Sequence, residues 1–371
     1  MRVNSLKLVN YRNYQELELA FQPALNIFIG CNAQGTTTIL EAVYYAACGS
    51  SFRGNRDGEL IKWNADGGSI SLGFSRLEVA NQLDFAFRRD KRRTIVYNGQ
   101  KIPLRELIGA FNVVLFAPDD LLLIKGAPAG RRKFLDMEIS QASPAYYREL
   151  ITYNRLLQQR NSLLKEIREG KSKAGMLEFW NPQLAASAAK ITAKRLEAVQ
   201  KFNMLANLMQ RRISGNEENL SLSYQIKGME NGQLAENMEI WYNEMLHGLN
   251  NEEIYRGVTC VGPHRDDIIV SVNGINLKSF GSQGQQRTAV LSMKLSELEF
   301  IRSETGEYPV LLLDDVMSEL DAGRRQQLLN FIEREGIQTL ITATDEAYFQ
   351  QAPLKTYFQV EAGQVKVVNK V

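Results

Sequence analysis

Residues 24–49, ALNIFIGCNAQGTTTILEAVYYAACG, contain the pattern that decides the fold. A nearly continuous apolar run ends in Gly30 and predicts a buried strand. The apolar residues after Thr38 recur at helical spacing, and Gly49 suits the left-handed cap that ends many helices. A strand, a glycine-containing loop and a helix in this order are typical of a phosphate-binding loop, in which backbone N–H groups and the helix N-terminus bind the anion.

The loop GCNAQGTTT, residues 30–38, departs from the phosphate-binding pattern at one position. Gly30 and Gly35 have the expected spacing, and Thr37 supplies a hydroxyl that can hold magnesium. Thr36, however, occupies the position at which such loops carry lysine. A glycine turn without a ligand is therefore an equally good interpretation of this segment when it is taken alone.

A second segment, VLLLDDVMSELD at residues 310–321, favours the nucleotide site. The apolar residues 310–313 predict a buried strand, and Asp314 and Asp315 follow it directly. In phosphate-loop ATPases the first acid holds magnesium, and a second can polarise the attacking water. The alternative is a solvated loop that begins with two acids, but acids seldom follow so apolar a strand without a cation to meet.

A third segment, SQGQQR at residues 282–287, precedes an amphipathic helix that contains Leu291, Leu295 and Leu298. A serine, a glycine and N–H groups at a helix start form a second anion cradle. One protomer cannot easily fold two cradles around one triphosphate, whereas two protomers that face each other can. The segment therefore predicts an ATP-dependent homodimer in which each copy closes the other's site.

The long separation between these segments predicts an α/β protein with a divided nucleotide-binding lobe. We expect residues 1–125 and 285–371 to form an ATP-binding lobe with a mixed sheet, and residues 126–284 to form a second lobe. Helical periodicity in residues 146–170 and 182–213 predicts two antiparallel helices within an arm at about 131–215. Asn98 and Gly99 predict a hairpin turn between two strands.

Composition limits the cellular compartments and the partners that we expect for the protein. We find no run of about 18 uncharged apolar residues, and the N-terminal residues lack the apolar core of a signal peptide. Three cysteines without metal-ligand spacing favour a reducing cytoplasm. The net charge of +2 says little about partners, but two local clusters are basic. The candidates for DNA contact are Arg88, Arg89, Lys91, Arg92 and Arg93, with Arg131, Arg132 and Lys133 as a second group.

The order of the loop, the long insertion, SQGQQR, the paired acids and TATD at residues 342–345 resembles the ABC-type ATPase heads of the SMC family, which implies that fold for the nucleotide-binding lobe. Other segments are more specific and resemble those of the RecF family of bacterial DNA repair proteins. The resemblance covers nearly the whole chain. These segments are LVNYRNY, LEAVYYAACGSSFR, LFAPDDLLLIKGAPAGRRKFLD, GPHRDD and SQGQQRT.

The resemblance implies a role for each matching position. Asp314 would be the magnesium-side acid with Thr37, and Asp315 would stand where related ATPases carry the water-activating carboxylate. Residues 342–344 would lie near the switch position, where transporters use histidine, so no γ-phosphate role carries over to them. Arg12 would touch phosphate or ribose. The phosphate loop would be Gly30, Cys31, Asn32, Ala33, Gln34, Gly35, Thr36, Thr37 and Thr38. The signature that meets the partner's ATP would be Ser282, Gln283, Gly284 and Gln285, and the loop at the dimer interface Ser318, Glu319, Leu320 and Asp321.

The resemblance also implies function and partners. Such proteins bind duplex DNA when ATP and Mg²⁺ have dimerised them, hydrolyse ATP slowly, and help RecR and RecO to load RecA at gaps. They are cytoplasmic and associated with the nucleoid.

Thr36 modifies this expectation. Losing the lysine removes a charge-assisted contact worth about 1.5–3 kcal/mol, and more in the transition state, where charge is met in a site closed to water. We therefore predict weakened ATP binding and nearly absent hydrolysis. An ATP-insensitive scaffold that binds DNA or protein is the alternative from another class, and a transporter ATPase subunit is a third that the inserted arm disfavours.

Overall fold

The computed structural model describes residues 1–31, 34–54, 56–230, 235–349 and 355–368. The chain divides into two compact units, residues 1–120 with 294–371 and residues 121–293. The expected boundaries were 125/126 and 284/285. The second division falls inside the helix α10 (Gln283–Thr305), so no linker composition marks it.

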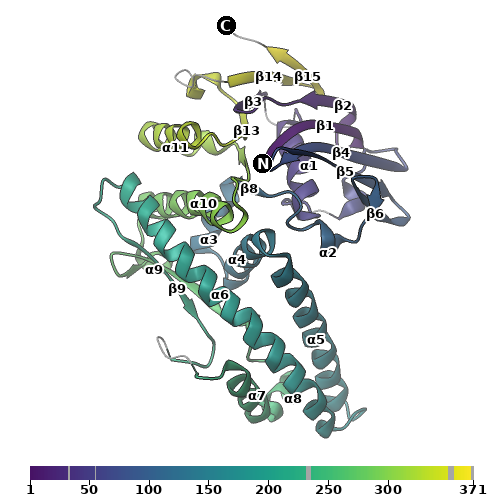
Figure 1. Cartoon of the computed structure of the whole chain (residues 1–371). Helices are drawn as coiled ribbons and strands as arrows, with labels where there is room; N and C mark the ends of the chain where they lie inside the picture. The colour runs from purple at the N-terminus through teal and green to yellow at the C-terminus, as the bar shows by residue number, and fades with distance from the viewer. Residues whose placement is uncertain (32–33, 55, 231–234, 350–354, 369–371) are drawn as a thin grey trace. The chain divides into compact units, whose positions relative to one another are not determined.

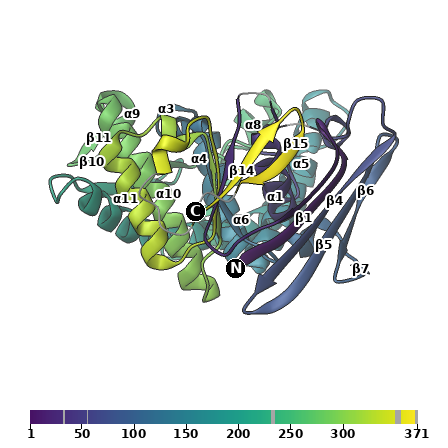
Figure 2. The same cartoon turned by 90° about the horizontal axis from the view of Figure 1, so that it is seen from above.

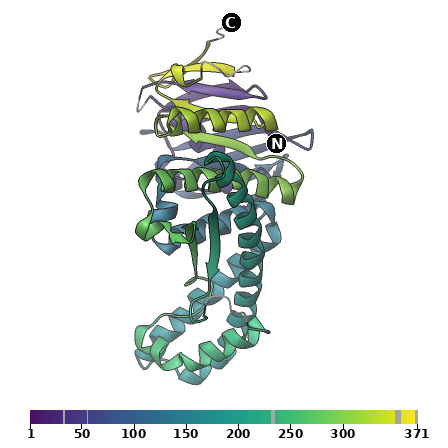
Figure 3. The same cartoon turned by 90° about the vertical axis from the view of Figure 1, so that its left-hand side faces the viewer.

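The first unit contains a six-stranded, mostly parallel sheet in the order β15-β14-β3-β13-β12-β8. Its strands are β3 (Leu25–Ile29), β8 (Val113–Phe116), β12 (Val310–Asp314), β13 (Thr339–Ala343), β14 (Lys355–Glu361) and β15 (Gln364–Val368). β3 pairs with β13 on one side and β14 on the other, as Figure 3 shows for the purple strand beside the yellow ones. Strands from before and after residues 117–309 thus share one sheet.

A second six-stranded sheet in the same unit is antiparallel, in the order β2-β1-β4-β5-β6-β7 (Figure 2). Its strands are β1 (Arg2–Tyr11), β2 (Tyr14–Ala20), β4 (Gly67–Arg76), β5 (Val79–Arg88), β6 (Lys91–Tyr97) and β7 (Gln100–Lys101). Asn98 and Gly99 both have positive φ, 48° and 80°, and make the predicted turn between β6 and β7.

Helix α1 (Thr36–Cys48) packs against β12 and β13 of the parallel sheet and against β4 of the antiparallel one. Because both sides are covered, nearly all of its residues are buried, including Glu41. Gly49 ends the helix at φ 64°, as predicted. The remaining helices of this unit are α2 (Leu104–Leu107), α11 (Ala322–Glu335) and the second part of α10.

The second unit is mainly helical, with one three-stranded antiparallel sheet in the order β11-β10-β9. Its helices are α3 (Leu122–Lys125), α4 (Pro128–Ala142), α5 (Pro144–Arg168), α6 (Leu177–Ile213), α7 (Met238–Gly248), α8 (Asn250–Arg256) and α9 (Leu277–Phe280), followed by the first part of α10. Its strands are β9 (Leu220–Gln225), β10 (Asp267–Val272) and β11 (Ile275–Asn276).

The long helices α5 and α6 pack side by side, as the short connection between them predicts (Figure 1). α6 begins at Leu177, so the expected start at Pro182 is wrong. Leu177 is fully buried against Leu163 and Leu164 of α5. This burial extends the helix in front of the proline, although Pro182 can donate no backbone hydrogen bond.

Buried ion pairs organise the core of the second unit. Arg195 donates to both oxygens of Asp136 at 2.9 Å, and Arg131 donates to both oxygens of Asp267 at 2.7 and 2.9 Å. Both guanidinium groups are almost fully buried. Along the described ranges of both units, no helix combines the length and the apolar character that crossing a membrane requires.

Candidate nucleotide-binding site

The glycines of the loop at residues 30–38 leave no room for side chains. A Cβ at Gly30 would lie 2.7 Å from the carbonyl oxygen of Val360. Gly35 has φ 116°, and a Cβ there would lie 2.7 Å from the Tyr14 hydroxyl, which itself donates to the Gly35 carbonyl at 3.1 Å. The backbone therefore requires glycine at both predicted positions. Asn32 and Ala33 lie outside the described residues, and Cys31 is exposed.

The N-terminus of α1 is arranged for an anion. Gly35 precedes the helix and offers no side chain to cap its first N–H groups. Thr36 is buried, with its methyl group on the side of Gly30, so it brings no charge to the loop. The helix start therefore keeps its backbone donors and dipole, but lacks the cation expected beside them.

The paired acids stand at the end of β12, as predicted. Asp314 is buried, and its Oδ1 accepts a hydrogen bond from the Thr342 hydroxyl at 2.9 Å. Asp315 adopts a left-handed backbone conformation, φ 54°, and its N–H donates to the same hydroxyl at 3.0 Å. Its Oδ1 is buried and has no hydrogen-bond partner among the residues that the structure describes. An unpartnered buried carboxylate oxygen in a left-handed residue indicates a site that a ligand completes.

The Thr37 hydroxyl lies close to the Asp314 carboxylate. Burial raises the pKa of Asp314, while the hydroxyls of Thr342 and Thr37 and the charge of Arg53 act in the opposite direction. The structure thus joins the end of β12 to the start of α1. Oxygen ligands from a threonine and a carboxylate suit Mg²⁺, which binds proteins through few ligands and keeps several waters. The residues therefore fit the metal and the phosphates that the sequence predicts.

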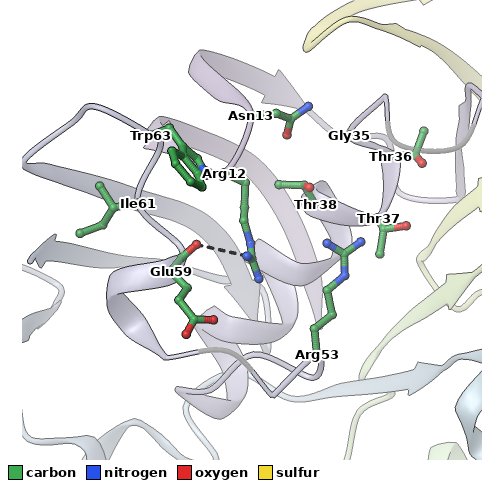
Figure 4. A pocket seen from close by; sticks show the side chains of 10 residues that line it. All are labelled: Arg12, Asn13, Gly35, Thr36, Thr37, Thr38, Arg53, Glu59, Ile61 and Trp63. Atoms are coloured by element: carbon green, nitrogen blue, oxygen red, sulfur yellow. Dashed lines mark hydrogen bonds between the residues drawn. The ribbon is translucent and has the colours of Figure 1, made fainter.

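A cavity of about 380 Å³ opens beside the start of α1. Figure 4 shows its lining residues: Arg12, Asn13, Gly35, Thr36, Thr37, Thr38, Arg53, Glu59, Ile61 and Trp63. The first strand and its turn supply Arg12 and Asn13, and the segment after α1 supplies the last four. The sequence analysis assigned no site role to Arg53, Ile61 or Trp63, although Arg53 is the last residue of the family-specific segment LEAVYYAACGSSFR.

Arg12 lines this cavity, but a carboxylate holds its guanidinium. Nε and Nη2 donate to the two oxygens of Glu41 at 2.9 and 2.6 Å, and Nη1 donates to the Glu59 carbonyl at 3.1 Å. Glu41 also accepts from Ser51 at 2.5 Å. The predicted phosphate or ribose contact of Arg12 stays a prediction, and the fork donors it would use are already engaged with Glu41.

In the second unit, residues 282–285 form a reciprocal cap at the start of α10. The Ser282 hydroxyl accepts the Gln285 N–H at 3.2 Å, and the Gln285 side chain accepts the Ser282 N–H at 3.1 Å. This capping box satisfies two of the N–H groups that the second anion cradle was expected to offer. Gln283 and Gly284 are exposed between them.

The predicted dimer loop, residues 318–321, lies between a 3-10 turn and α11 in the first unit. Leu320 is buried, whereas Ser318, Glu319 and Asp321 are exposed. The Asp321 side chain accepts the Arg324 N–H at 2.9 Å and caps α11. The buried side chain of Leu320 thus anchors the loop, and the polar side chains of the loop face the solvent.

The basic clusters differ in availability. Arg88, Lys91 and Arg92 are exposed at the hairpin that joins β5 and β6. Arg89 is exposed and donates to the carbonyls of Ala65 and Lys62 at 2.9 and 3.2 Å.

Arg93 and the second cluster have structural partners. Arg93 pairs with Asp57 at 3.0 Å and lies over the Tyr45 ring. Arg131 is buried on Asp267, so its assignment to DNA contact is wrong. Arg132 donates to the Asp266 carbonyl at 2.7 Å, while Lys133 is exposed.

Comparison with known proteins identifies relatives over the whole length. The chain matches the RecF/RecN/SMC N-terminal domain family over residues 2–368. It is 44% identical over 352 residues to the DNA replication and repair protein RecF of Alkaliphilus oremlandii, which covers 93% of each chain. It is 41% identical to RecF of Listeria monocytogenes over 372 residues, 99% of this chain and 100% of the relative.

Solved structures with a similar fold include members of the same family. A RecF–ATP complex, described as a recombination mediator of the RecFOR pathway, has a TM-score of 0.92 and 34% identity, covering 99% of this chain and 98% of that one. The Smc head domain of Pyrococcus furiosus has a TM-score of 0.58 at 16% identity, and shows the shared ABC-type ATPase fold alone.

Proposed function

This chain belongs to the RecF family of DNA replication and repair proteins, and from that premise we propose that it is an ATP-dependent DNA-binding protein of recombinational repair. ATP joins two copies head to head on duplex DNA, and its hydrolysis releases them. The two lobes of each copy have distinct tasks in this proposal: residues 1–125 with 285–371 bind the nucleotide, and residues 126–284 present the signature to the other copy.

One observation carries the proposal. The Asp314 carboxylate accepts a hydrogen bond from Thr342 and lies close to the Thr37 hydroxyl at the start of α1, and a carboxylate oxygen of Asp315 has no hydrogen-bond partner in the described part of the chain. Bound Mg²⁺ would neutralise phosphate charge there. The chain's own contribution is to hold Asp314 by two hydroxyls and to aim Asp315 at the adjoining space. The complexes of relatives with ATP support the same ligand.

DNA contact is assigned to the exposed hairpin residues Arg88, Lys91 and Arg92. Contacts to phosphates position a protein on DNA without reading its sequence, so we expect salt-sensitive binding with weak sequence preference. RecR and RecO are the proposed protein partners and RecA the indirect one, because a relative acts as a recombination mediator in the RecFOR pathway.

Thr36 makes hydrolysis the weak step in this proposal. Its side chain is buried and uncharged, so the charge that develops in the transition state lacks its usual cation. Some ATP binding remains and turnover is nearly absent. An ATP-insensitive scaffold is the second candidate, since the same threonine favours it.

Sizing the protein with and without ATP and Mg²⁺, beside the Thr36→Lys form, tests the proposal. We expect ATP to shift both forms toward a dimer on DNA, and only the Thr36→Lys form to return as ATP is consumed. A monomer at every ATP concentration would favour the scaffold. Steady-state turnover equal to that of the Thr36→Lys form would contradict the assigned effect of Thr36.

A further inference from the structure

A second cavity in the first unit, of about 670 Å³, lies beside strands β6 and β7 of the antiparallel sheet (Figure 2). Its charged lining residues are Arg92, Arg93, Lys101 and Asp57, and the remaining ones, Ile95 and residues 102–104, are apolar. Three cations thus face one carboxylate. A concave site with net positive charge and apolar walls suits an anionic ligand that also carries apolar atoms.

Two of the three cations are available to such a ligand. Arg92 and Lys101 are exposed, and neither forms an ion pair with any residue that the structure describes. Arg92 also belongs to the hairpin to which DNA contact is assigned, so the cavity continues that basic surface. A DNA strand on the hairpin can therefore place a backbone phosphate in the cavity.

The third cation, Arg93, is held by Asp57. Its Nη1 donates to both carboxylate oxygens at 3.0 and 3.1 Å, and also to the Tyr45 hydroxyl. The guanidinium lies over the Tyr45 ring, 5.3 Å from its centre, and 17% of the side chain is exposed. Arg93 is therefore fixed at the cavity wall, with its charge directed at a carboxylate.

Asp57 occupies a place that another anion can take. Its side chain is 43% exposed, and an ion pair with so exposed a partner contributes little to stability. A phosphate in the cavity can meet all three cations, whereas Asp57 is bonded to Arg93 and Tyr45. Exchange of the carboxylate for a phosphate therefore gains charged contacts that Asp57 does not make.

We propose that this cavity binds a backbone phosphate of duplex DNA, and that Asp57 competes with the phosphate by holding Arg93 until the phosphate takes its place. The inference rests on the proposed DNA-binding function and adds Arg93 and Lys101 to its contacts. Because the contact is made to the backbone, it reads no base. Asp57 thereby lowers the affinity for every duplex alike.

A double-mutant cycle tests the competition. Fluorescence anisotropy measures the affinity for one duplex of mixed sequence, with ATP and Mg²⁺ and at several salt concentrations. The four forms are the natural chain, Asp57→Asn, Arg93→Gln and the form with both substitutions. Asparagine keeps an oxygen for the Tyr45 hydroxyl but carries no charge that competes with phosphate.

Asp57→Asn should tighten duplex binding more strongly when Arg93 is present, because only Arg93 can use the vacated place. The factor should be at least about threefold larger than in the Arg93→Gln chain, which is a small part of what a charged hydrogen bond is worth. With Arg93 present, the slope of log K against log[salt] should also steepen by about 0.9, the value for one more neutralised phosphate.

Equal factors in the two backgrounds would overturn the inference, because a carboxylate that acts only through its general field gives additive effects. The proposed function would survive that result. If none of the four forms bound duplex DNA in a salt-sensitive way, the proposed function would be contradicted as well. The two failures are therefore distinguishable in one experiment.

Asp90→Asn is the matched control, because it removes the same charge from the exposed turn between β5 and β6, outside this cavity. Its effect on duplex binding should be the same with and without Arg93. A dependence on Arg93 as large as that of Asp57→Asn would contradict a specific competition.

Lys101→Gln tests the cavity without disturbing the ion pair of Arg93. It should weaken duplex binding and lower the salt slope by about 0.9, and an unchanged slope would place the DNA outside the cavity. Melting without DNA checks that each form is folded. If Arg93→Gln lowers the melting temperature, the comparison of Asp57→Asn with Asp90→Asn and the slope of Lys101→Gln decide, since these variants keep Arg93 on the Tyr45 ring.

Discussion

The hydroxyl of Thr342 donates a hydrogen bond to Oδ1 of Asp314 at 2.9 Å and so connects the ends of the neighbouring strands β13 and β12. The same hydroxyl accepts the N–H of Asp315 at 3.0 Å. One threonine thus orients the metal-side acid and fixes the backbone of the second acid. Residues 342–344, which the sequence predicts to lie near the switch position, thus include a residue that is engaged with both acids.

Replacing Thr342 by valine keeps the shape and removes both hydrogen bonds. We expect ATP affinity in the presence of Mg²⁺ to fall by about 1–2 kcal/mol, because Asp314 loses its orientation and a buried N–H loses its partner. Titrating Mg²⁺ at fixed ATP measures the effect. Thr344→Val, at an exposed position two residues away, is the control and should bind as the natural chain does. Unchanged magnesium dependence in Thr342→Val would contradict the orienting role.

Asp314→Asn should stabilise the protein without nucleotide while abolishing its magnesium-dependent ATP binding. Burial raises the pKa of Asp314 above its ordinary value of 3.8, so the folded state holds the proton more tightly than the unfolded state does. The free energy of unfolding therefore falls as pH rises through this range, and at pH 7 the buried charge is a cost. Asparagine retains the oxygen that accepts from Thr342 and removes the charge.

The expected gain for Asp314→Asn at pH 7 is about 0.5–2 kcal/mol, measured by chemical denaturation. The gain should shrink as the pH falls below the ordinary value of 3.8, where the natural carboxyl is protonated in both states. A loss of stability in Asp314→Asn at pH 7 would contradict this prediction, because it would show that the ionised carboxylate stabilises the folded protein.

His264 makes the second unit sensitive to acid. Burial lowers the pKa of this histidine to about 4, helped by the charges of Arg265 and Arg132. Its Nδ1 accepts from the Tyr153 hydroxyl at 2.5 Å, and its Nε2–H donates to the Thr259 carbonyl at 3.2 Å. Both contacts suit the neutral ring, so protonation is disfavoured while the unit is folded.

Between pH 6.5 and about 4 the unfolded chain binds a proton at this position that the folded chain does not, so stability falls as pH falls. We expect the melting temperature of the natural chain to drop between pH 7 and 5 more steeply than that of His264→Gln. His247→Gln, at the other, exposed histidine, is the matched control and should follow the natural chain. Parallel curves for His264→Gln and the natural chain would contradict the assignment.

The exposed hairpin charges predict the salt dependence of DNA binding. Substituting Arg88, Lys91 and Arg92 by glutamine should reduce the slope of log K against log[salt] by about 0.9 for each phosphate that the variant no longer neutralises. Fluorescence anisotropy with duplex DNA at several salt concentrations measures this slope. Lys133→Gln is the comparison from the other cluster, and a larger effect there than at the hairpin would move the DNA-binding surface to the second unit.

Ser282 separates helix capping from contact with nucleotide. Ser282→Ala loses the N-cap of α10 and should cost about 0.5–2 kcal/mol of stability. Ser282→Asp keeps an efficient cap, so its stability should be close to that of the natural chain. It also places a negative charge where the partner's triphosphate is proposed to bind. We therefore expect Ser282→Asp to melt normally and to lose ATP-dependent dimerisation, whereas Ser282→Asn should retain both.

Size-exclusion chromatography with light scattering measures the dimer in each of these variants. If Ser282→Asp forms a dimer at the same ATP concentration as the natural chain does, Ser282 does not lie close to the partner's triphosphate.

The elements that sequence pattern predicts well are those whose signal is local. The apolar run before Gly30, the spacing after Thr38 and the acids after Leu313 each occupy a few consecutive residues, and the structure places them as expected. We predicted that these segments share one sheet because an acid can hold a phosphate-bound metal only if it lies near the phosphate loop.

Pairings between distant residues could not be predicted in this way. Arg131 and Arg132 are adjacent in a basic run that is typical of a solvated surface, yet Asp267, which pairs with Arg131, is 136 residues away. Glu41 has the pattern of a polar residue on an amphipathic helix, but α1 is covered on both sides, and Arg12 neutralises the acid. Helix α6 begins before Pro182 because Leu177 is buried by another helix, which no local rule reports.

The order of strands in the parallel sheet has a consequence for synthesis of the chain. β12 and β13 lie between β8 and β3, although residues 117–309 separate β8 from β12 along the chain. On the ribosome, β3, α1 and β8 emerge before β12 and β13, the two strands that lie between β3 and β8 in the finished sheet. The unit of residues 121–293 is continuous and can complete its own packing in the meantime.

At about 5–20 residues per second, translation of the intervening segment takes on the order of ten seconds or more. During that time the unpaired edges of β3 and β8 are open to wrong pairing. The acids of β12 and the Thr342 hydroxyl arrive last, so an incomplete chain cannot assemble the ATP site. Nucleotide binding thus becomes available only to chains that have been translated nearly to their end.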